Sequence, residues 1–540
     1  MRRREGTRRL GGVLAAAVLL LLTGAGAGAA APVQGGTLTI GLDVDPTTLD
    51  PHQSAAAASY LIGSLNINES LLFQDPTGKL VPWLATRYTV SPDGRAFTFD
   101  LAQNVAFSDG APFDAEAVKY NFDRIVNPNF RAGGSVNALV GYVGATVVDP
   151  HTVRINFKDP YAPFLSYAAQ GTLGMVSPKT TATQTPAQTA RAPVGTGAFV
   201  ASEYVSADHI AMVRNPAFNR REPWSDHQGP AYLDRVVWKI VPESMTRAIT
   251  LSSGETQMIY IIGYGTTTGS ILSQLQKNSQ VRVDAYPFPG SAYLWLINVR
   301  KPPTDDVRVR QAVLYGINRR AIIAAIYRGL GQPACGYISH VLLPDPAACA
   351  MYPYDPRKAG QLLDEAGWKM GPNRVREKGG QPLQVVINSL NSGGGDLPDI
   401  QPVQGQLLEL GFDAKIKSQA FGPRTQDNFT CADNFGTIFL RANDPDTLSA
   451  LFDSRNIGSN FNWSCFSDPE IDRMLAEGRS TLDPAKRQAL YLQLDRMLLE
   501  RAVAIPMMDE LAVWVRRPNV EAVKYNYLVY PAFTDAYLAK

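Results

Sequence analysis

Apolar and polar residues alternate in several short stretches of the chain. A period of two places every second side chain on one face of an extended strand. The alternating apolar residues are Leu38, Ile40 and Leu42; Phe97, Phe99 and Leu101; and Val153, Ile155 and Phe157. We therefore expect strands over these three stretches.

Apolar residues at helical spacing follow polar residues that are suited to cap a helix. Such side chains accept hydrogen bonds from the free amides of the first turn, and proline fits the first helical position. The expected starts are Asp114, Asp355 with Pro356, Ser467 with Glu470 at capping-box spacing, and Asp483 with Pro484. Gly367 is expected just past the end of the second helix. Strands and helices mixed along the whole chain predict an α/β architecture.

A strand, a proline turn and a helix are predicted one after another between residues 293 and 317. Residues 293–299 are apolar enough to form a buried strand, and two prolines follow at 302 and 303. The apolar stripe of the next helix consists of Val309, Ala312, Val313, Gly316 and Ile317. Asp305 and Asp306 lie at its N-terminus, where the helix dipole favours negative charge.

The first 31 residues have the layout of a secretory signal. Five arginines lie within residues 1–9, residues 10–22 are apolar, and residues 24–31 are glycine and alanine. An apolar core of this length is shorter than the roughly 20 residues of a spanning helix, which disfavours the alternative of an uncleaved anchor. We expect residues 1–30 to be a signal peptide, cleaved near Ala29 to Ala31, with general export favoured over the twin-arginine route.

Cysteine is missing from the chain before position 335, so no cysteine is available for lipid attachment behind the signal. We therefore expect a periplasmic protein of a cell with two membranes, and not a lipoprotein. Without residues 1–30 the chain has 46 basic and 48 acidic residues, which gives no electrostatic reason to bind nucleic acid or a membrane surface. Its 540 residues are too many for one core and predict two or three domains.

Four cysteines in an exported chain predict disulfides. Local closure favours Cys335 with Cys349, which leaves Cys431 with Cys465. The alternative of a metal site is disfavoured because the spacings contain no CxxC pair. The five histidines are scattered singly, at positions 52, 151, 209, 227 and 340, and the hydrolase motifs GxSxG and HExxH are missing. We therefore expect no metal, no cofactor and no enzyme activity.

Five motifs, in order along the chain, carry a resemblance to a known family. They are GTLTIGLDVDPTTLDPH at 36–52, VAFSDGAPFDAEAVKY at 105–120, PVGTGAF at 193–199, VRVRQAVLYGINRRAII at 307–323 and YDPRKAGQLLDEAGW at 354–368. Together they resemble the peptide- and nickel-type solute-binding proteins of ABC transporters, family 5. The resemblance covers nearly all of the chain that follows the predicted signal.

The resemblance implies a periplasmic-binding-protein-like α/β fold of type II, with two hinged lobes and an extra inserted domain. The implied domains are domain I at 31–69, 190–294 and 510–540, domain II at 70–189 and domain III at 295–509. It also implies a monomer that closes over a small molecule or short peptide and delivers it to the membrane permease of an importer. A metal or metallophore carrier of the same fold, a secreted hydrolase and a chaperone-like peptide binder are the alternatives.

The family's Ala-Asp-Tyr-x-x-Pro pattern carries an aspartate that receives a peptide's ammonium group. Its counterpart in this chain is the stretch from Leu440 to Pro445, which places Arg441 where the aspartate would stand. A guanidinium suits a carboxylate or phosphate, so we expect a ligand with an anionic group or without a free amine. The alternatives are that Arg441 points to solvent or pairs with Asp444, or that Asp444 receives the ammonium.

Further ligand-binding candidates follow from the same resemblance. Ser54, Ala55 and Ala56 match a strand that offers backbone groups to a peptide. Asn460, Phe461 and Trp463 lie in the stretch NFNWSC, which is similar to that of dipeptide-binding relatives, and the two aromatic rings would wall an apolar pocket. Tyr293 and Trp295 lie on a strand at the predicted crossing between lobes. We expect one of these two in the core, and simple packing is the alternative for each aromatic residue.

Overall fold

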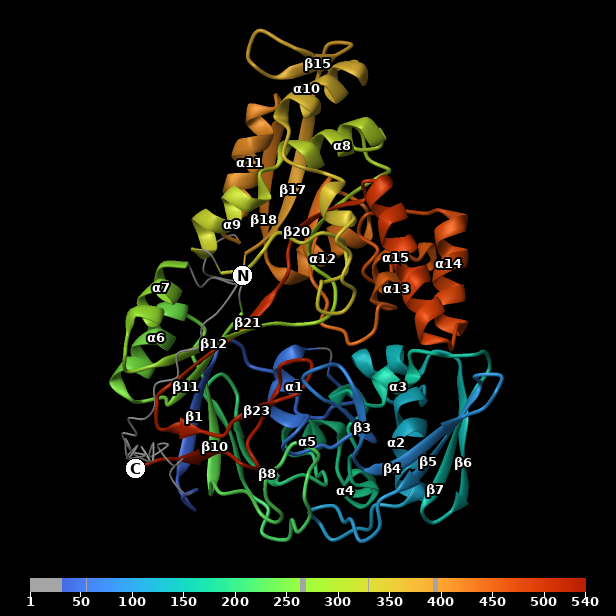
Figure 1. Ribbon diagram of the computed structural model, residues 1–540, viewed down its shortest axis with the longest axis vertical. Coiled ribbons are helices and arrows are strands. Elements are labelled where there is room, and N and C mark those ends of the chain that lie inside the picture. Colours follow the sequence, from blue (N-terminus) through green and yellow to red (C-terminus); the bar gives the residue numbers. More distant parts are fainter. Residues whose placement is uncertain (1–31, 55, 263–268, 329, 392–396) are drawn as a thin grey trace, which may run out of the picture.

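A computed structural model describes residues 32–54, 56–262, 269–328, 330–391 and 397–540, which form three main sheets (Figure 1). The predicted signal peptide and Ala55 lie outside the described residues. In the described part of the chain, no helix has the length and apolar character needed to cross a membrane.

The largest sheet has seven strands in the order β12-β21-β11-β1-β10-β9-β8. β1 pairs in parallel with its neighbours β10 and β11, and the outer pairs are antiparallel. The strands are β1 (Thr37–Leu42), β8 (Phe199–Val205), β9 (His209–Arg214), β10 (Arg235–Ile240), β11 (Met258–Ile262), β12 (Arg282–Pro287) and β21 (Leu511–Arg516). The helices packed with this lobe are α1 (Ala57–Gly63), α5 (Pro186–Arg191), α6 (Ser244–Ser253) and α7 (Gly269–Lys277).

A second sheet of five strands lies in the upper lobe of Figure 1, in the order β18-β17-β19-β13-β20. Its strands are β13 (Tyr293–Ile297), β17 (Gln384–Leu390), β18 (Asp413–Gln419), β19 (Phe435–Ile438) and β20 (Ala504–Met508). Eight helices of this lobe are α8 (Val307–Gly316), α9 (Arg319–Tyr327), α10 (Pro356–Glu365), α11 (Ile400–Glu409), α12 (Phe421–Phe429), α13 (Thr447–Phe452), α14 (Pro469–Ser480) and α15 (Pro484–Glu500).

The third sheet is antiparallel, with four strands in the order β4-β5-β7-β6. It lies at the lower right of Figure 1, below the helices of the five-stranded lobe. Its elements are β4 (Ala85–Val90), β5 (Ala96–Leu101), β6 (Tyr142–Asp149), β7 (Thr152–Phe157), α2 (Ala115–Val126), α3 (Phe164–Tyr167) and α4 (Pro178–Thr183). Small two- and three-stranded pairings use β2 (Leu72–Gln74), β3 (Leu80–Pro82), β14 (Lys369–Met370), β15 (Arg376–Lys378), β16 (Gln381–Pro382), β22 (Val520–Glu521), β23 (Lys524–Tyr525), β24 (Pro531–Ala532) and β25 (Tyr537–Leu538).

Two short connections join the seven-stranded sheet to the five-stranded sheet. Residues 288–292 lead from β12 to β13, and residues 509–510 lead from β20 to β21. The backbone amide of Phe288 donates to the carbonyl oxygen of Glu510 at 3.2 Å, so the two connections lie side by side. Short paired connections between two lobes form a hinge, around which closure over a ligand takes place.

Most of the elements expected from the periodicity are present. Asp114, Asp355 and Asp483 each cap a helix by accepting a backbone hydrogen bond, and Gly367 follows α10 with φ of 91°. The expected cap of α14 is wrong, because Asp468 and not Ser467 accepts from the amide of Glu470. A carboxylate one residue later competes successfully for the same free amides.

The α/β fold of the periplasmic-binding type is confirmed. Each of the three main sheets lies in one of the predicted domains, although β13 begins two residues before the predicted start of domain III. The exact domain boundaries stay a prediction. Both expected disulfides, Cys335 with Cys349 and Cys431 with Cys465, are formed.

Candidate ligand-binding site

Arg441 lies on a segment that runs beside the first connection between the lobes. Its backbone bridges that of Gly290, and the amide of Ser291 donates to the carbonyl oxygen of Leu440 at 2.9 Å. Gly290 has φ of 135°, and a Cβ atom there would lie 2.0 Å from the same Leu440 oxygen. Only glycine allows this close approach, which fixes Arg441 at the hinge.

The side chain of Arg441 points into a group of aromatic rings from the lobe of the seven-stranded sheet. Its guanidinium carbon lies 4.3 Å from the ring centre of Phe288, 5.6 Å from that of Tyr260 and 5.9 Å from that of Tyr530. The Nη2 atom donates to the hydroxyl of Tyr260. The buried Nε and Nη1 atoms have no hydrogen-bond partner among the described residues. Since a buried unpaired donor is costly, these two atoms are free to bind a ligand.

Two carboxyl groups lie near this cation without bonding to it. Both side-chain oxygens of Glu510 and one of Asp43 are buried with no hydrogen-bond partner among the described residues. Burial raises the pKa of Glu510 well above its usual range, and the charge of Arg441 opposes this effect. Burial also raises the pKa of Asp43, against the charges of Arg247 and Arg441. One cation, Arg441, and two acids, Glu510 and Asp43, therefore have side-chain atoms without a side-chain hydrogen-bond partner among the described residues of this region.

Tyr293 and Trp295 lie in the core of the five-stranded lobe, with 1% and 0% of their surfaces exposed. The Trp295 Nε1 atom donates to Asp399 at 2.7 Å, and the Tyr293 hydroxyl donates to the same carboxylate at 3.3 Å. Burial raises the pKa of Asp399 to about 6, while these hydrogen bonds hold it lower. The core position was expected for one of the two rings and is found for both.

Asp444 has its own cation and is not bonded to Arg441. Its oxygens accept from Arg487 at 2.6 and 2.9 Å, and one of them accepts from the Ser166 hydroxyl at 3.3 Å. Ser166 lies on α3, so this cluster joins the inserted region to the five-stranded lobe. The structure thus places Arg441 neither in solvent nor against Asp444.

A cavity of about 420 Å³ opens next to Arg441, within the range of roughly 300 to 1,000 Å³ that is typical of small-molecule sites. Its walls come from residues 134–170 on one side and residues 440–479 on the other. Arg441, Asn460 and Phe461 are the predicted ligand-binding residues that line it. The cavity also holds Asp446 and Arg479, which are bonded to each other at 3.1 Å.

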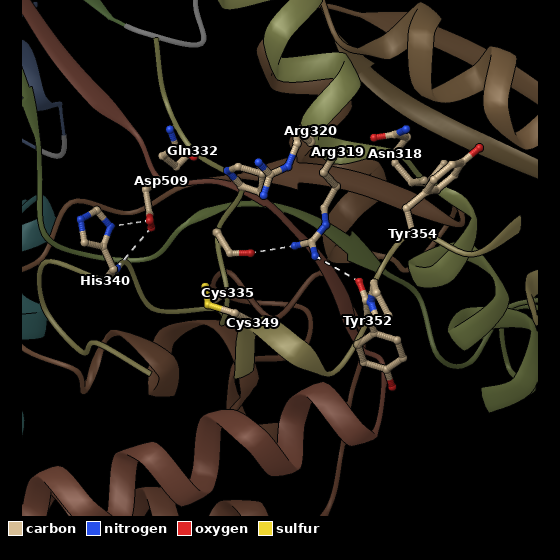
Figure 2. A pocket seen from close by; sticks show the side chains of 14 residues that line it. Asn318, Arg319, Arg320, Gln332, Cys335, His340, Cys349, Tyr352, Tyr354 and Asp509 are labelled. Carbon is tan, nitrogen blue, oxygen red and sulfur yellow. Dashed lines mark hydrogen bonds and ion pairs between the residues drawn. A yellow bond between two sulfur atoms is a disulfide. The ribbon is translucent and has the colours of Figure 1, made fainter. Parts of the chain in front are cut away.

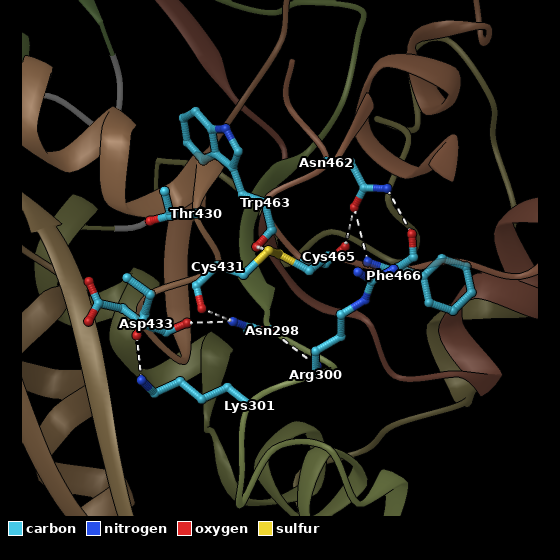
Figure 3. Close-up of a disulfide and its surroundings, with 12 residues drawn as sticks. Asn298, Arg300, Lys301, Thr430, Cys431, Asp433, Asn462, Trp463, Cys465 and Phe466 are labelled. Carbon is cyan, nitrogen blue, oxygen red and sulfur yellow. Dashed lines mark hydrogen bonds between the residues drawn. A yellow bond between two sulfur atoms is a disulfide. The ribbon is translucent and has the colours of Figure 1, made fainter. Parts of the chain in front are cut away.

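Trp463 supports this wall from behind. Its Nε1 atom donates to the carbonyl oxygen of Asn460 at 3.1 Å, and its ring meets that of Phe461 edge to face at 5.9 Å. The Cys431–Cys465 disulfide ties the stretch to the end of α12, where Asn298 donates to the carbonyl oxygen of Cys431 at 2.9 Å (Figure 3). The disulfide therefore fixes the loop that carries Asn460 and Phe461.

Ser54 and Ala56 occupy a segment whose polar groups are already engaged. The carbonyl oxygen of Ser54 accepts from the Tyr60 hydroxyl at 2.8 Å and from the amide of Gly134 at 2.8 Å. The amide of Ala56 donates to the hydroxyl of Ser54 at 3.0 Å. These atoms hold the loop at Gly134, which belongs to the cavity wall, so the segment supports the site from outside.

A larger cavity of about 660 Å³ is lined by residues of the five-stranded lobe and by Asp509 of the connection between the lobes (Figure 2). The Cys335–Cys349 disulfide, Arg319 and His340 are part of its lining. Arg319 is saturated, because its Nη1 atom donates to the carbonyl oxygens of Ala334 and Pro506 at 2.7 and 2.6 Å. Size alone would favour this cavity, whereas the unsaturated charges favour the smaller one at the hinge.

Glu510, Asp43 and the aromatic rings around Arg441 were not among the predicted site residues. One signal for Glu510 is present in the sequence, since Asp509 and Glu510 interrupt an apolar run from Ala504 to Val515. Charged residues in such a run need a partner or a function. Within the described residues there is no group of three or more His, Cys, Asp or Glu side chains that could hold a metal ion.

Comparisons with known proteins identify the family and support the fold. Residues 79–463 match the family described as bacterial extracellular solute-binding proteins, family 5 Middle. The chain is 30% identical over 486 residues to the glutathione-binding protein GsiB of Salmonella paratyphi A, with 88% of this chain and 89% of that protein covered.

Solved structures are similar to the fold as well. NikA from Brucella suis in complex with Fe(III)-EDTA superposes with a TM-score of 0.80 and 25% identity, covering 93% of this chain and 100% of that chain. DppA from Helicobacter pylori in complex with the peptide STSA superposes with a TM-score of 0.79 and 24% identity, covering 94% of this chain and 99% of that one.

Proposed function

Because the chain belongs to family 5 of the bacterial extracellular solute-binding proteins, which serve ABC importers, we propose that it captures a small peptide-type ligand carrying an anionic group. The ligand would lie at the hinge between the two lobes. Closure of the lobes over it would present the liganded form to the membrane permease. A ligand drives this closure only to the extent that it binds the closed form more tightly.

The observation that carries the proposal is the unsaturated guanidinium of Arg441. A ligand carboxylate would satisfy its Nε or Nη1 atom in a site that the surrounding rings shield from water. Hydrogen bonds between charged partners are roughly twice as strong as those between neutral ones. A ligand ammonium in the same place would face a fixed positive charge.

The similarity to glutathione-binding proteins supports the same ligand class. Glutathione is a small peptide with two carboxylates, so it offers the anionic group that Arg441 requires. In the metal-carrier alternative the anionic group would be that of a metal chelate, and the similar structure from Brucella suis is in complex with Fe(III)-EDTA. Both ligand classes need the arginine, and their binding to the purified protein distinguishes them.

Three further features belong to the proposal. The family consists of binding proteins, and we expect this chain to release its ligand chemically unchanged. We also expect a monomer in solution and a mature N-terminus near Ala29 to Ala31, without lipid. Mass spectrometry of the exported protein and of its recovered ligand, together with light scattering, checks these expectations.

Isothermal titration calorimetry with a matched panel tests the ligand class. The panel contains glutathione, neutral dipeptides, acidic dipeptides with a blocked amine, and Fe(III)-EDTA, each with wild type and Arg441→Gln. We expect the wild type to bind the anionic peptides and the variant to lose at least tenfold in affinity for them. Tight binding of neutral dipeptides, unchanged in the variant, would refute the proposal.

A further inference from the structure

Glu510 is the most unusual buried group at the hinge. It lies in the connection from β20 to β21, none of its surface is exposed, and neither carboxyl oxygen has a side-chain hydrogen-bond partner among the described residues. Its backbone is in use, because the carbonyl oxygen accepts from the amide of Phe288. The backbone amide of Leu511 is the hydrogen-bonding group that favours its ionised form, and a buried carboxyl without a bonded cation is costly, so packing alone does not account for the group.

The unsaturated cation Arg441 is the charged neighbour that acts most strongly on Glu510. The two groups influence each other electrostatically, yet each keeps free hydrogen-bonding atoms, which a direct ion pair would have consumed. Phe288 connects them, since its ring lies under the guanidinium and its amide binds the Glu510 backbone. A cation and an acid that influence each other without a mutual hydrogen bond match a ligand that carries both charges itself.

We propose that Glu510 and Arg441 together receive the zwitterionic α-amino-acid group of the ligand, with Glu510 accepting from the ammonium and Arg441 donating to the carboxylate. This inference rests on the proposed function and names the part of the ligand that enters the hinge. An ammonium and a carboxylate on one carbon atom lie side by side, and the two receiving residues both contact Phe288, Arg441 through its side chain and Glu510 through its backbone. Ordinary peptides separate these charges at opposite ends, whereas a γ-glutamyl peptide keeps them together.

The protonation of Glu510 gives the inference a second readout. Burial raises its pKa well above the usual range, the nearby carboxyls Asp399 and Asp509 add to the rise, and Arg441 and the backbone amide of Leu511 oppose it. The empty site therefore holds the Glu510 proton to higher pH than an exposed glutamate does. An ammonium group favours the ionised form, so binding would release this proton to the buffer. Asp43 lies near the same arginine, and the Glu510→Gln variant separates its contribution.

Calorimetry with three probes tests the inference. The probes are glutathione, its α-linked isomer with the same atoms and charge, and desamino-glutathione, which has no ammonium. Wild type should prefer glutathione to the isomer by tenfold or more. Glu510→Gln should lower the affinity for glutathione about 10- to 100-fold and leave that for the desamino compound nearly unchanged. The proton release, measured from the enthalpy in buffers of different ionisation enthalpy, should disappear in this variant.

Glu222→Gln is the matched control. Glu222 is also buried with one unpartnered oxygen, and its charged neighbours are Arg220, Asp535 and His227 instead of Arg441. This variant should bind all three probes as wild type does. If Glu510→Gln fails to fold, the comparison of the three probes on wild type still decides the outcome.

Equal binding of the two isomers, or undiminished binding of glutathione by Glu510→Gln, overturns the inference. Wild type that binds amine-blocked acidic peptides but not glutathione also overturns it and leaves the proposed function standing. If the wild type binds none of the anionic peptides, both the inference and the proposed function are wrong.

Discussion

Arg441 and Asp444 are three residues apart, yet only Asp444 is bonded to a side chain of opposite charge in the described part of the chain. Asp444 is saturated by two hydrogen bonds from Arg487, while Arg441 keeps two unpartnered nitrogen atoms among aromatic rings. Both clusters join parts of the molecule that are distant in sequence. The Asp444–Arg487 pair holds the inserted region against the five-stranded lobe, whereas Arg441 lies at the hinge without a bonded carboxylate among the described residues. The two charged residues therefore differ in whether a group of opposite charge is bonded to them, and this difference is the basis of the proposed binding role of Arg441.

The largest expected effect comes from breaking the saturated pair. Arg487→Ala leaves the Asp444 carboxylate buried without its cation and should destabilise the protein by about 3–5 kcal/mol. Denaturant unfolding measures this change. Arg473→Ala is the control. It removes an exposed ion pair between Arg473 and Glu477, both on α14, and should change stability by less than about 0.5 kcal/mol. Similar effects of the two variants would show that the Asp444 pair is not structural.

The two disulfides should differ in what they do to binding. In the chain-entropy model, closing loops of 14 and 34 residues contributes about 3 and 4 kcal/mol, so removing either pair by Cys→Ser substitution should lower stability by a similar amount. Only the removal of Cys431 and Cys465 should also weaken ligand binding, because this bond fixes the loop of Asn460 and Phe461. Thermal unfolding and calorimetry on both double variants check this, and equal losses of affinity would contradict it.

Asp495 is a buried acid that, unlike Asp444, has no arginine bonded to it within the described residues. Burial raises its pKa to about 7, against hydrogen bonds from the backbone of Tyr337 and Ile338. Its folded pKa lies above the unfolded value, so the folded state binds more protons, and its contribution to stability is lost as the pH rises from about 4 to 7. Asp495→Asn should remove this loss, a difference on the order of 3 kcal/mol at neutral pH. Denaturant unfolding of both proteins at pH 4, 5.5 and 7 measures it, and parallel pH profiles would contradict it.

Replacing Arg441 should affect ligand binding more than stability, which is the opposite of what we expect for Arg487. Arg441→Gln removes a cation that has no bonded carboxylate in the described structure, so the unfolding midpoint should fall far less than it does in Arg487→Ala. The same substitution should lower the affinity for an anionic peptide about 10- to 100-fold, because a charged hydrogen bond is lost. Calorimetry and thermal unfolding of one preparation measure both effects. A strongly lowered midpoint would assign Arg441 to the scaffold.

Sequence periodicity was sufficient for several elements and for the general α/β class, while the periplasmic-binding type of fold came from the family resemblance. Alternation located β1, β5 and β7, and aspartate caps located α2, α10 and α15, since these signals are local. The cap of α14 was misplaced by one residue because two adjacent polar side chains compete for it. Cysteine spacing was sufficient for both disulfides.

The candidate site was only partly accessible from the sequence. Arg441, Asn460 and Phe461 line one cavity, and their role in ligand binding stays a prediction, whereas Tyr293 and Trp295 are core residues that hold Asp399. Period two marks both faces of a fully buried strand as apolar and cannot tell which face meets a cleft. Glu510 was missed because its meaning depends on Arg441, which lies 69 positions earlier in the chain and meets it only at the hinge.

A crystal structure of the wild-type protein with bound glutathione tests the central claim most directly. We predict a carboxylate oxygen of the ligand within hydrogen-bonding distance of the Arg441 Nε or Nη1 atom, in the cleft beside residues 288–292. A ligand bound elsewhere, or one whose ammonium group and no carboxylate contacts the Arg441 guanidinium, would contradict the account.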